Sequence, residues 1–586
     1  LERLSMNLPL KAYWVLLADH IRPQRARFGL LAGLLLVNIA LQVINPQIIS
    51  GFIDAALGGA ALSLLVRAAL LFLGIAVLQQ ALSVAVVYLG EKVAWRATNA
   101  LRAELASHCL NLDMGFHNAH TPGELIERID GDVAELAKFF SQFVVILVGN
   151  LLLLAGILAA LFLVDWRVGL AFTVFAALSL LVLQRVRDIA LPQQKAVRQA
   201  EADLYGFVEE QLAGTEDIRS SGAVDFSLRE LYRRQKAILV NDRRARQRGW
   251  FIDLAMGSLL TAGNILAISS GYLLFSTGTI TIGTVYLFVH YANLLETPIW
   301  TLMREVKSFQ TIGACVERLS ELRAIRPEVI DGTEALPLGG SPTLAFEDVS
   351  FGYNGADPVL RELSFALRPA SVLGLLGRTG SGKSTLARLV FRLYDPIHGR
   401  ILLDGQDIRA AKLGSLHRRV ALVTQEVQLF HGTVRDNLTF FDRDIPDEQI
   451  QRAITRLGLS YWFAALPAGL DTLLEGGGRG LSAGEAQILA LTRVFLRDPG
   501  LVILDEASAR LDPATEQRLE RAIDRLLEGR TAIIIAHRLG TVQRASEVMI
   551  LENGCVREYG RRAELAADPT SRFSQLLKSG LEEVLS

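Results

Sequence analysis

The sequence predicts a chain of two parts, a six-span α-helical transmembrane domain followed by an α/β domain built on a phosphate-binding loop. Two observations predict this division. Apolar runs of about 20 residues, the length that crosses a bilayer, recur between Phe28 and Leu295. Residues 377–384 then fit the pattern Gly-x-x-x-x-Gly-Lys-Ser/Thr, which is typical of loops that hold nucleotide phosphates. We expect a membrane domain over 1–325, a linker over 326–342, which is rich in Pro and Gly, and an α/β domain over 343–586.

The composition suits a membrane protein, because 51% of the 586 residues are hydrophobic and only 21% are charged. The net charge of −1 gives no reason to expect a nucleic acid partner. The cysteines Cys109, Cys315 and Cys555 are too few and too scattered for a disulfide framework or a zinc site. Charges between Leu1 and Arg27 argue against a cleavable signal peptide.

The six spans are expected from apolar runs that carry no charged residue. These runs cover residues 28–53, 68–90, 139–164, 168–184 and 254–295. The last run is too long for one span and contains a turn-like segment at Ser276–Gly283, so it is divided into two spans. Several such runs would be exceptional in a soluble protein, which makes buried soluble helices a weak alternative.

The loops between the spans predict their orientation. The segments after spans one, three and five are short, whereas those after spans two and four are long and rich in Lys and Arg, as at 243–248. Because positive loops stay in the cytoplasm, we place the long segments, both termini and the α/β domain there. We expect the long segments to be helices that continue beyond the bilayer.

Two ionisable residues, His290 and Glu296, lie in or near the sixth expected span. A charge in mid-bilayer costs roughly 2.5–3.5 kcal/mol on insertion scales, so such groups usually face a cavity or a partner. One interpretation is that both residues line a substrate pathway. The other is that Glu296 lies near the cytoplasmic end of the span or pairs with a neighbouring helix.

The phosphate-binding loop has the surroundings that its motif requires. An apolar segment at 371–376 reads as a buried strand, and residues 385–391 have the apolar spacing of a helix. Backbone N–H groups of the loop and the helix N-terminus would surround phosphate oxygens. Lys383 would reach the β and γ phosphates, and the Ser384 hydroxyl would ligate Mg²⁺.

The second half of the chain also resembles the nucleotide-binding domain of an ABC transporter. The segments that carry this resemblance are Val349–Tyr353, Val423–Gln425, Leu481–Glu485, Leu501–Glu506 and Ile533–His537. The whole chain resembles exporter-type half-transporters, in which six membrane helices precede one ATPase domain of ABC type. The resemblance implies ATP-driven export of a small or amphipathic substrate by alternating access, with ATP and Mg²⁺ as cofactors.

Other functions remain as alternatives to export. An importer on the same fold, a lipid flippase and a peptide exporter would share these motifs. A soluble regulatory ABC ATPase is disfavoured, because six spans are fused in the same chain. The residues do not identify the substrate.

The resemblance implies a set of residues that bind this chain's own nucleotide. Tyr353 would stack on adenine. The full set is Tyr353, Gly377, Arg378, Thr379, Gly380, Ser381, Gly382, Lys383, Ser384, Thr385 and Gln425. Gln425 and Asp505 would hold Mg²⁺ together with Ser384. Glu506 would polarise the attacking water as general base, and His537 would contact the γ-phosphate.

The family's signature, usually Leu-Ser-Gly-Gly-Gln, corresponds to Leu481–Glu485. Ser482 and Gly484 are kept, whereas Ala483 and Glu485 depart from it. In this family the signature reaches the γ-phosphate on a partner chain. Ser482 and Glu485 also have the spacing of a helix capping box, which is a purely structural alternative.

Two further departures lie in motifs that, in this family, act on the nucleotide site of the partner chain in a dimer. In the D-loop, Asp512 is kept while Ala509 and Arg510 differ. The family also has a glutamate at the position of Gly476, but in this chain the acid stands one residue earlier, at Glu475. The motifs for this chain's own nucleotide are intact. We therefore expect a heterodimer with a second half-transporter in the lipid bilayer, with a homodimer as the alternative, and expect a bacterial plasma (inner) membrane location.

Two cytoplasmic turns are expected to transmit the nucleotide state to the membrane domain. Residues 116–125 resemble the first coupling segment of these exporters, and residues 221–226 match the second more weakly. Ordinary turns between helices are the alternative interpretation of both.

Overall fold

The computed structural model describes residues 22–337, 339–353, 357–476, 481–505, 513–536 and 542–579. The chain packs as two units. The first unit runs to Leu110 and resumes over Gly123–Ile325, and the second comprises Asn111–Pro122 and the chain from Arg326 onward. Residues 111–122 therefore pack with the second unit, although they lie within the range 1–325 expected for the membrane domain.

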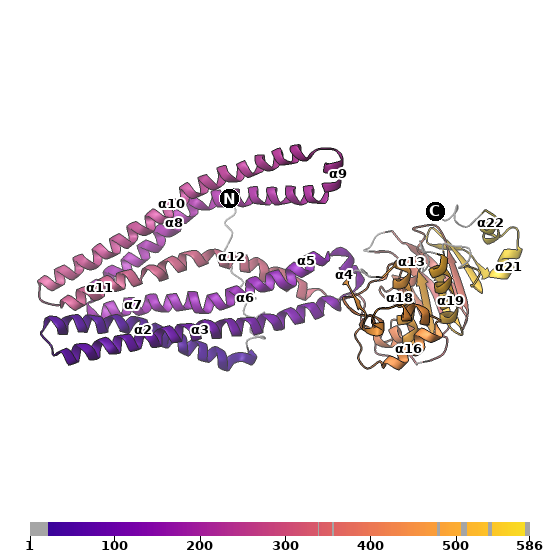
Figure 1. Cartoon of the computed structure of the whole chain (residues 1–586), viewed down its shortest axis with the longest axis horizontal. Helices are drawn as coiled ribbons and strands as arrows, with labels where there is room; N and C mark the ends of the chain where they lie inside the picture. The colour runs from indigo at the N-terminus through magenta and orange to yellow at the C-terminus, as the bar shows by residue number, and fades with distance from the viewer. Residues whose placement is uncertain are drawn as a thin grey trace. The chain divides into compact units, whose positions relative to one another are not determined.

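The first unit is entirely helical over its described residues. Its helices are η1 (Arg22–Gln24), α2 (Arg25–Leu57), α3 (Leu62–Leu110), α5 (Pro122–Ile126), η2 (Glu127–Asp132), α6 (Val133–Gln142), η3 (Phe143–Val148), α7 (Gly149–Val164), α8 (Trp166–Ala213), α9 (Thr215–Ser220), α10 (Val224–Ser276), α11 (Ile282–Leu294) and α12 (Glu296–Ala324). Helices α8 and α10 run side by side and are joined through α9 (Figure 1). With 48 and 53 residues they are each about 70–80 Å long, more than twice a hydrocarbon core, as expected for spans that continue outside the bilayer.

Five helical stretches of the described chain are long and apolar enough to cross a membrane. They are Arg22–Leu57, Leu62–Leu110, Ile146–Val164, Trp166–Val186 and Val224–Ser276. Expected spans one, two, four and five fall within them, and the third, 139–164, overlaps Ile146–Val164. The sixth falls on α11, which has only 13 residues before the helix is interrupted at Leu295 and α12 begins. The sixth span stays a prediction.

A buried apolar cluster joins the helices of the first unit. Its fully buried members include Ile157 of α7, Phe172 of α8, and Phe288 and Tyr291 of α11. The Tyr291 hydroxyl donates to the Val43 carbonyl over 2.7 Å. Such a bond satisfies a polar group that water cannot reach in the bilayer.

The second unit combines two large sheets and the two-stranded sheet β7-β8 with surrounding helices, so the expected order of a helical membrane domain and an α/β domain is confirmed. A four-stranded antiparallel sheet has the order β2-β1-β4-β5, and a six-stranded sheet has the order β12-β11-β3-β10-β9-β6. The strands are β1 (Leu344–Phe351), β2 (Leu360–Leu367), β3 (Val372–Leu376), β4 (His398–Leu403), β5 (Gln406–Asp407), β6 (Val420–Val423), β7 (Gly432–Thr433), β8 (Leu473–Leu474), β9 (Leu501–Asp505), β10 (Thr531–Ile535), β11 (Glu547–Glu552) and β12 (Cys555–Arg561).

The helices of this unit are short. They are α4 (Met114–Ala119), α13 (Lys383–Val390), α14 (Leu413–Arg419), α15 (Val434–Thr439), α16 (Asp447–Arg456), α17 (Ser460–Ala464), η5 (Gly469–Asp471), α18 (Ala483–Arg497), α19 (Pro513–Leu527), α21 (Arg562–Ala567) and α22 (Arg572–Ser579). Strands β11, β3, β10, β9 and β6 are parallel, and β12 is antiparallel at one edge. The central strands β9 and β10 are buried almost throughout, as parallel strands covered on both faces should be. Their carboxyl ends lie at one edge of the sheet.

Candidate functional site

The phosphate-binding loop follows β3, and its backbone requires glycine at three positions. Gly377, Gly380 and Gly382 have φ angles of 153°, 82° and 102°, which residues with a side chain rarely adopt. A Cβ at Gly377 would lie 2.4 Å from the Leu551 carbonyl oxygen, and one at Gly382 would lie 2.5 Å from Leu360 Cδ2. Both the turn and the close packing around it therefore depend on these glycines.

Lys383 begins helix α13 and is held within the loop. Its side chain is buried, and its Nζ donates to the carbonyl oxygens of Gly377 over 2.7 Å and Arg378 over 2.9 Å. A buried ammonium group beside a helix N-terminus gives the loop a local positive potential. That arrangement suits an anion such as a phosphate group.

Two more expected site residues lie at the same edge of the sheet. Asp505 is the last residue of β9, and Gln425 follows the end of β6 by two residues. Because β3, β10, β9 and β6 are consecutive parallel strands of the sheet, these residues and the loop after β3 all lie at the same carboxyl edge. Ligands of open α/β sheets bind at that edge. The expected residues Glu506, Asp512 and His537 lie outside the described residues.

Tyr353 packs beside the helix that carries the loop lysine. Its hydroxyl lies 3.0 Å from Thr385 Oγ1 and accepts a hydrogen bond from Arg388 Nη1 over 3.2 Å. Its ring meets those of Phe351 and Tyr394 edge-on, at centroid distances of 5.0 and 5.3 Å. Tyr353 and Thr385, both expected in the site, are thus in contact. Tyr394 was not predicted as a site residue, because a lone tyrosine after a helix gives no signal in the sequence.

The segment with the signature pattern begins helix α18 with a capping box. The Ser482 backbone N–H donates to Glu485 Oε2 over 2.8 Å, and the Glu485 N–H donates to Ser482 Oγ over 3.3 Å. The structural interpretation of this pair is therefore confirmed. Gly484, in the first turn of the helix, is buried.

A buried arginine that the sequence analysis missed fixes the chain after Gln425. Arg493 of α18 donates to the carbonyl and to Oδ1 of Asn437 over 2.5 and 2.9 Å, and to the Gln428 carbonyl over 3.0 Å. Burial, aided by the nearby charge of Arg497, lowers the pKa of Arg493 to about 10. Both arginines and Phe430 line a groove beside this segment.

The expected first coupling segment is anchored within the second unit. Asp113 accepts a hydrogen bond from the Phe116 N–H over 3.1 Å at the start of α4, and another from the Glu328 N–H over 2.6 Å. Asn118 donates to the Tyr394 hydroxyl over 2.7 Å. The expected second segment, 221–226, lies between α9 and α10, and its Phe226 is exposed.

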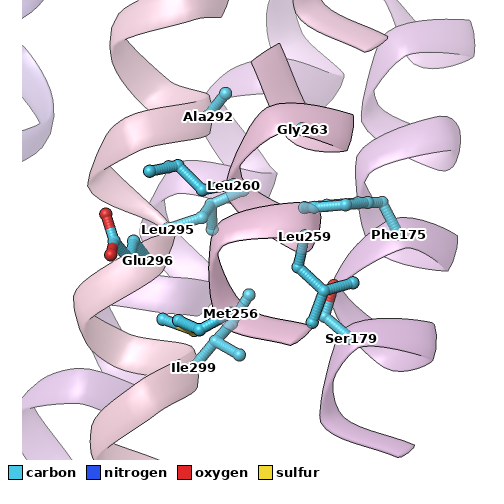
Figure 2. Close-up of a pocket in the computed structure, with 10 residues that line it drawn as sticks. All are labelled: Phe175, Ser179, Met256, Leu259, Leu260, Gly263, Ala292, Leu295, Glu296 and Ile299. Atoms are coloured by element: carbon cyan, nitrogen blue, oxygen red, sulfur yellow. The ribbon is translucent and has the colours of Figure 1, made fainter. Parts of the chain in front are cut away.

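In the first unit, His290 and Glu296 lie on consecutive helices. Glu296, the first residue of α12, lines a small apolar pocket between α8, α10 and the junction of α11 with α12. Figure 2 shows its carboxylate directed away from Phe175 and Ser179, which lie on the opposite side of the pocket. The Ser179 hydroxyl is buried and has no hydrogen-bond partner among the described residues. His290, half-buried on α11, has its ring 5.9 Å from that of Tyr286 and is not one of the lining residues.

Two family models match the chain. One, described as the ABC transporter transmembrane region, matches residues 28–299, and the other, described as ABC transporter, matches residues 360–509. Their order along the chain is that of the two units.

Similar proteins cover nearly the whole chain. An ATP-dependent lipid A-core flippase of Pseudomonas fluorescens is 31% identical over 85% of this chain and 83% of its own length. An uncharacterised ABC transporter ATP-binding protein of Bacillus subtilis, YfiC, is 29% identical over 98% of this chain and 94% of its own. A fatty acid ABC transporter ATP-binding/permease protein of Mycobacterium bovis is 29% identical over 80% of this chain and 74% of its own.

A solved structure shares the fold. The structure of a bacterial Atm1-family ABC exporter with ATP bound matches with a TM-score of 0.77 and 23% identity, covering 95% of this chain and 98% of that one.

Proposed function

The chain belongs to the ABC transporter family, and we propose that it forms one half of a dimeric exporter that works by alternating access. As a family member with both regions in one chain, it is an integral membrane protein that couples ATP hydrolysis to export. We assign residues 1–325 to the membrane domain, 326–342 to the linker and 343–586 to the ATPase domain. ATP held between two ATPase domains would favour one membrane conformation, and hydrolysis would release it.

One observation carries the proposal of an ATP site in this chain. The loop Gly377–Ser384, Asp505 and Gln425 lie at the carboxyl ends of β3, β9 and β6, which are parallel strands of one sheet. In this proposal the loop N–H groups and Lys383 bind the phosphates, and Tyr353 stacks on adenine. Arg378, Thr379, Gly380, Ser381, Gly382 and Thr385 complete the binding surface.

In this proposal, Mg²⁺ is held by oxygen-bearing side chains at that edge of the sheet. Hydroxyl, amide and carboxylate oxygens are the ligands that Mg²⁺ prefers, which fits Ser384, Gln425 and Asp505. The ion would neutralise charge on the phosphates. Glu506 would accept the proton of the attacking water, and His537 would contact the γ-phosphate, because phosphoryl transfer depends mainly on positioning and charge.

We propose a heterodimer as the working unit. Ser482, Gly484, Glu485 and Asp512 would act on ATP bound by the partner chain, and the replacements at Ala483 and Glu485 weaken that site. The carboxylate of Glu485 lies at the N-terminus of α18, where it reduces the attraction of the helix for an anion. The partner would then carry a full signature and a degenerate form of the motif that stands at Leu501–Glu506 in this chain.

The substrate we propose is amphipathic and lipid-like. Relatives named for lipid A-core and for fatty acids support this class. His290 and Glu296 are proposed to face the pathway, with the ATPase domain in the cytoplasm of a bacterial inner membrane. A Glu296→Gln variant should alter ATPase stimulation by a fluorescent phosphatidylethanolamine in vesicles. Ser179→Ala is the matched control in the same pocket. If the ATPase activity of Glu296→Gln were stimulated as strongly as that of the wild type, Glu296 would not be part of the substrate pathway.

The central experiment compares the ATPase rate of the wild-type chain with that of Glu506→Gln and Lys383→Ala in lipid. Glu506→Gln should bind ATP yet hardly hydrolyse it, whereas Lys383→Ala should bind it weakly. Near-normal turnover of Glu506→Gln would refute the general-base role. Subunit stoichiometry then separates the assemblies: a two-copy particle with robust, Glu506-dependent turnover indicates a homodimer, and an inactive chain rescued by a second half-transporter indicates a heterodimer.

A further inference from the structure

The turn Arg392–Asp395, which follows Phe391 at the end of helix α13, forms a junction between three parts of the second unit. Arg392 is buried, with a φ of 55°. Its guanidinium donates to Asp395 Oδ1 over 2.9 Å, to the Ala411 carbonyl over 3.2 Å and to the Ile330 carbonyl over 2.8 Å. The bond to Ile330 ties the turn to the segment that follows α12, and the bond to Ala411 ties it to the loop between β5 and α14. The turn is therefore fixed in place.

Tyr394, within this turn, contacts two segments that lie far apart in the sequence. Its hydroxyl accepts the 2.7 Å hydrogen bond from Asn118 of α4. Its ring lies edge-on to Tyr353, at 85° and 5.3 Å between centroids, and 5.5 Å from Phe351. Tyr394 is only 9% exposed. One side chain thus touches both the α4 segment and the tyrosine assigned to adenine.

Tyr353 is held on its other side by α13, the helix that begins at Lys383. Thr385 and Arg388 of that helix contact its hydroxyl. The orientation of the Tyr353 ring is therefore set by α13 at one end and by the rings of Phe351 and Tyr394 at the other. Edge-on aromatic contacts are directional and contribute about 0.5–1.5 kcal/mol beyond burial.

We propose that Tyr394 is a positioning residue that couples ATP binding at Tyr353 to the position of the α4 segment, residues 113–120, through Asn118. This inference rests on the proposed function of the ATP site. Adenine stacked on Tyr353 would favour the ring orientation that Tyr394 supports, and a fixed Tyr394 presents its hydroxyl to Asn118. Because coupling is reciprocal, loss of the Asn118 bond must weaken ATP binding by the factor by which ATP strengthens that bond.

The test uses the full chain in lipid nanodiscs and a non-hydrolysable ATP analogue with Mg²⁺. Tyr394→Phe removes the hydroxyl but keeps the ring, and Asn118→Ala removes the same bond from an exposed residue. Tyr461→Phe, on an exposed tyrosine of α17, is the control for loss of a hydroxyl. Two quantities are measured: the Kd of the analogue, and amide hydrogen exchange over 113–120 with and without it.

In the wild type and in Tyr461→Phe, the analogue should slow exchange over 113–120. Tyr394→Phe and Asn118→Ala should each weaken analogue binding about threefold to tenfold, the range expected for one neutral hydrogen bond, and should abolish most of the protection. The double variant should be no weaker than either single variant.

Two results would overturn the coupling. The first is that Tyr394→Phe binds the analogue with wild-type affinity and shows wild-type protection from exchange over 113–120. The second is that the double variant loses affinity for the analogue by the product of the two single losses. A purely structural role would change exchange equally with and without the analogue. Failure of the ATP site itself looks different, because then the wild-type chain would not bind the analogue, or Lys383→Ala would bind it equally well.

Discussion

Arg318 of α12 donates a hydrogen bond from Nε to Oδ2 of Asp132 over 2.9 Å and a second from Nη2 to Oδ1. Asp132 is buried in the π-helical turn η2. Asp130, two residues earlier in the same turn, forms an ion pair with Arg102 of α3 at 2.8 Å. Two acids of the turn η2 thus bond it to both α3 and α12. Helix α12 ends at Ala324, one residue before the end of the first unit at Ile325.

The Asp132→Asn substitution should destabilise the first unit. It keeps the size of the side chain but leaves the Arg318 guanidinium without its carboxylate. Because Arg318 is half exposed to water, we expect a loss of about 1–3 kcal/mol, less than for a fully buried pair. Thermal unfolding followed by tryptophan fluorescence measures it. Glu135→Gln, which breaks an exposed pair with Lys138, is the control and should change stability by less than about 1 kcal/mol. Equal melting temperatures would contradict the prediction.

The thiol of Cys315 should be slow to react with maleimides. Burial, together with the hydrogen bond and charge of Asp132, raises its pKa to about 11, and the thiolate is the reactive form. Labelling should therefore be far slower than at the exposed Cys555, and should rise about tenfold per pH unit towards pH 11. Mass spectrometry of the two peptides after timed labelling measures both rates. Similar rates at Cys315 and Cys555 would show that the thiol is accessible and ionised.

The same pKa predicts how this group affects stability at high pH. The folded state raises the pKa from 9.0 to about 11, so it favours the neutral thiol. The stabilisation is fully present below pH 9 and is lost as the pH rises through 11. Substitution of Cys315 by serine should flatten that alkaline loss, which unfolding at pH 8 and pH 10.5 measures.

How much the sequence predicted depends on how local each signal is. The loop at Gly377–Ser384 and the apolar spans are contiguous patterns, and the structure has the expected strand, loop and helix there. Tyr394 and Asn118 are 276 residues apart, and Asp132 and Arg318 are 186 apart. Contacts of that kind arise only from packing between distant segments, so no pattern in the sequence indicates them. The interruption at Leu295 was missed for a related reason, because its hydropathy matches that of the span around it.

Arg493 should be essential for the order of the chain after Gln425. Arg493→Gln removes donors to three acceptors, two on the buried Asn437 and one on the exposed Gln428. The buried Asn437 carbonyl loses its donor, whereas Asn437 Oδ1 keeps the hydrogen bond from the Phe430 N–H. An unsatisfied buried acceptor costs about 1–3 kcal/mol, so we expect a loss of that size and faster amide exchange over 428–437. Arg497→Gln is the matched control, because its guanidinium lies over the Phe440 ring at 5.1 Å, a contact of about 1 kcal/mol. Equal effects of the two variants would contradict this role.

Glu485 separates the structural and functional interpretations of the signature segment. Glu485→Gln keeps a side chain that can complete the capping box with Ser482, so stability should change by less than about 0.5 kcal/mol. It also removes a carboxylate from the start of α18, so ATP should bind more tightly at the partner's site in the assembled transporter. Glu485→Ala, which removes half of the box, should lose about 0.5–2 kcal/mol. If Glu485→Gln left the ATP affinity of the partner's site unchanged, the carboxylate would serve only to cap the helix, and the argument for an asymmetric dimer would then rest on the D-loop and on Gly476.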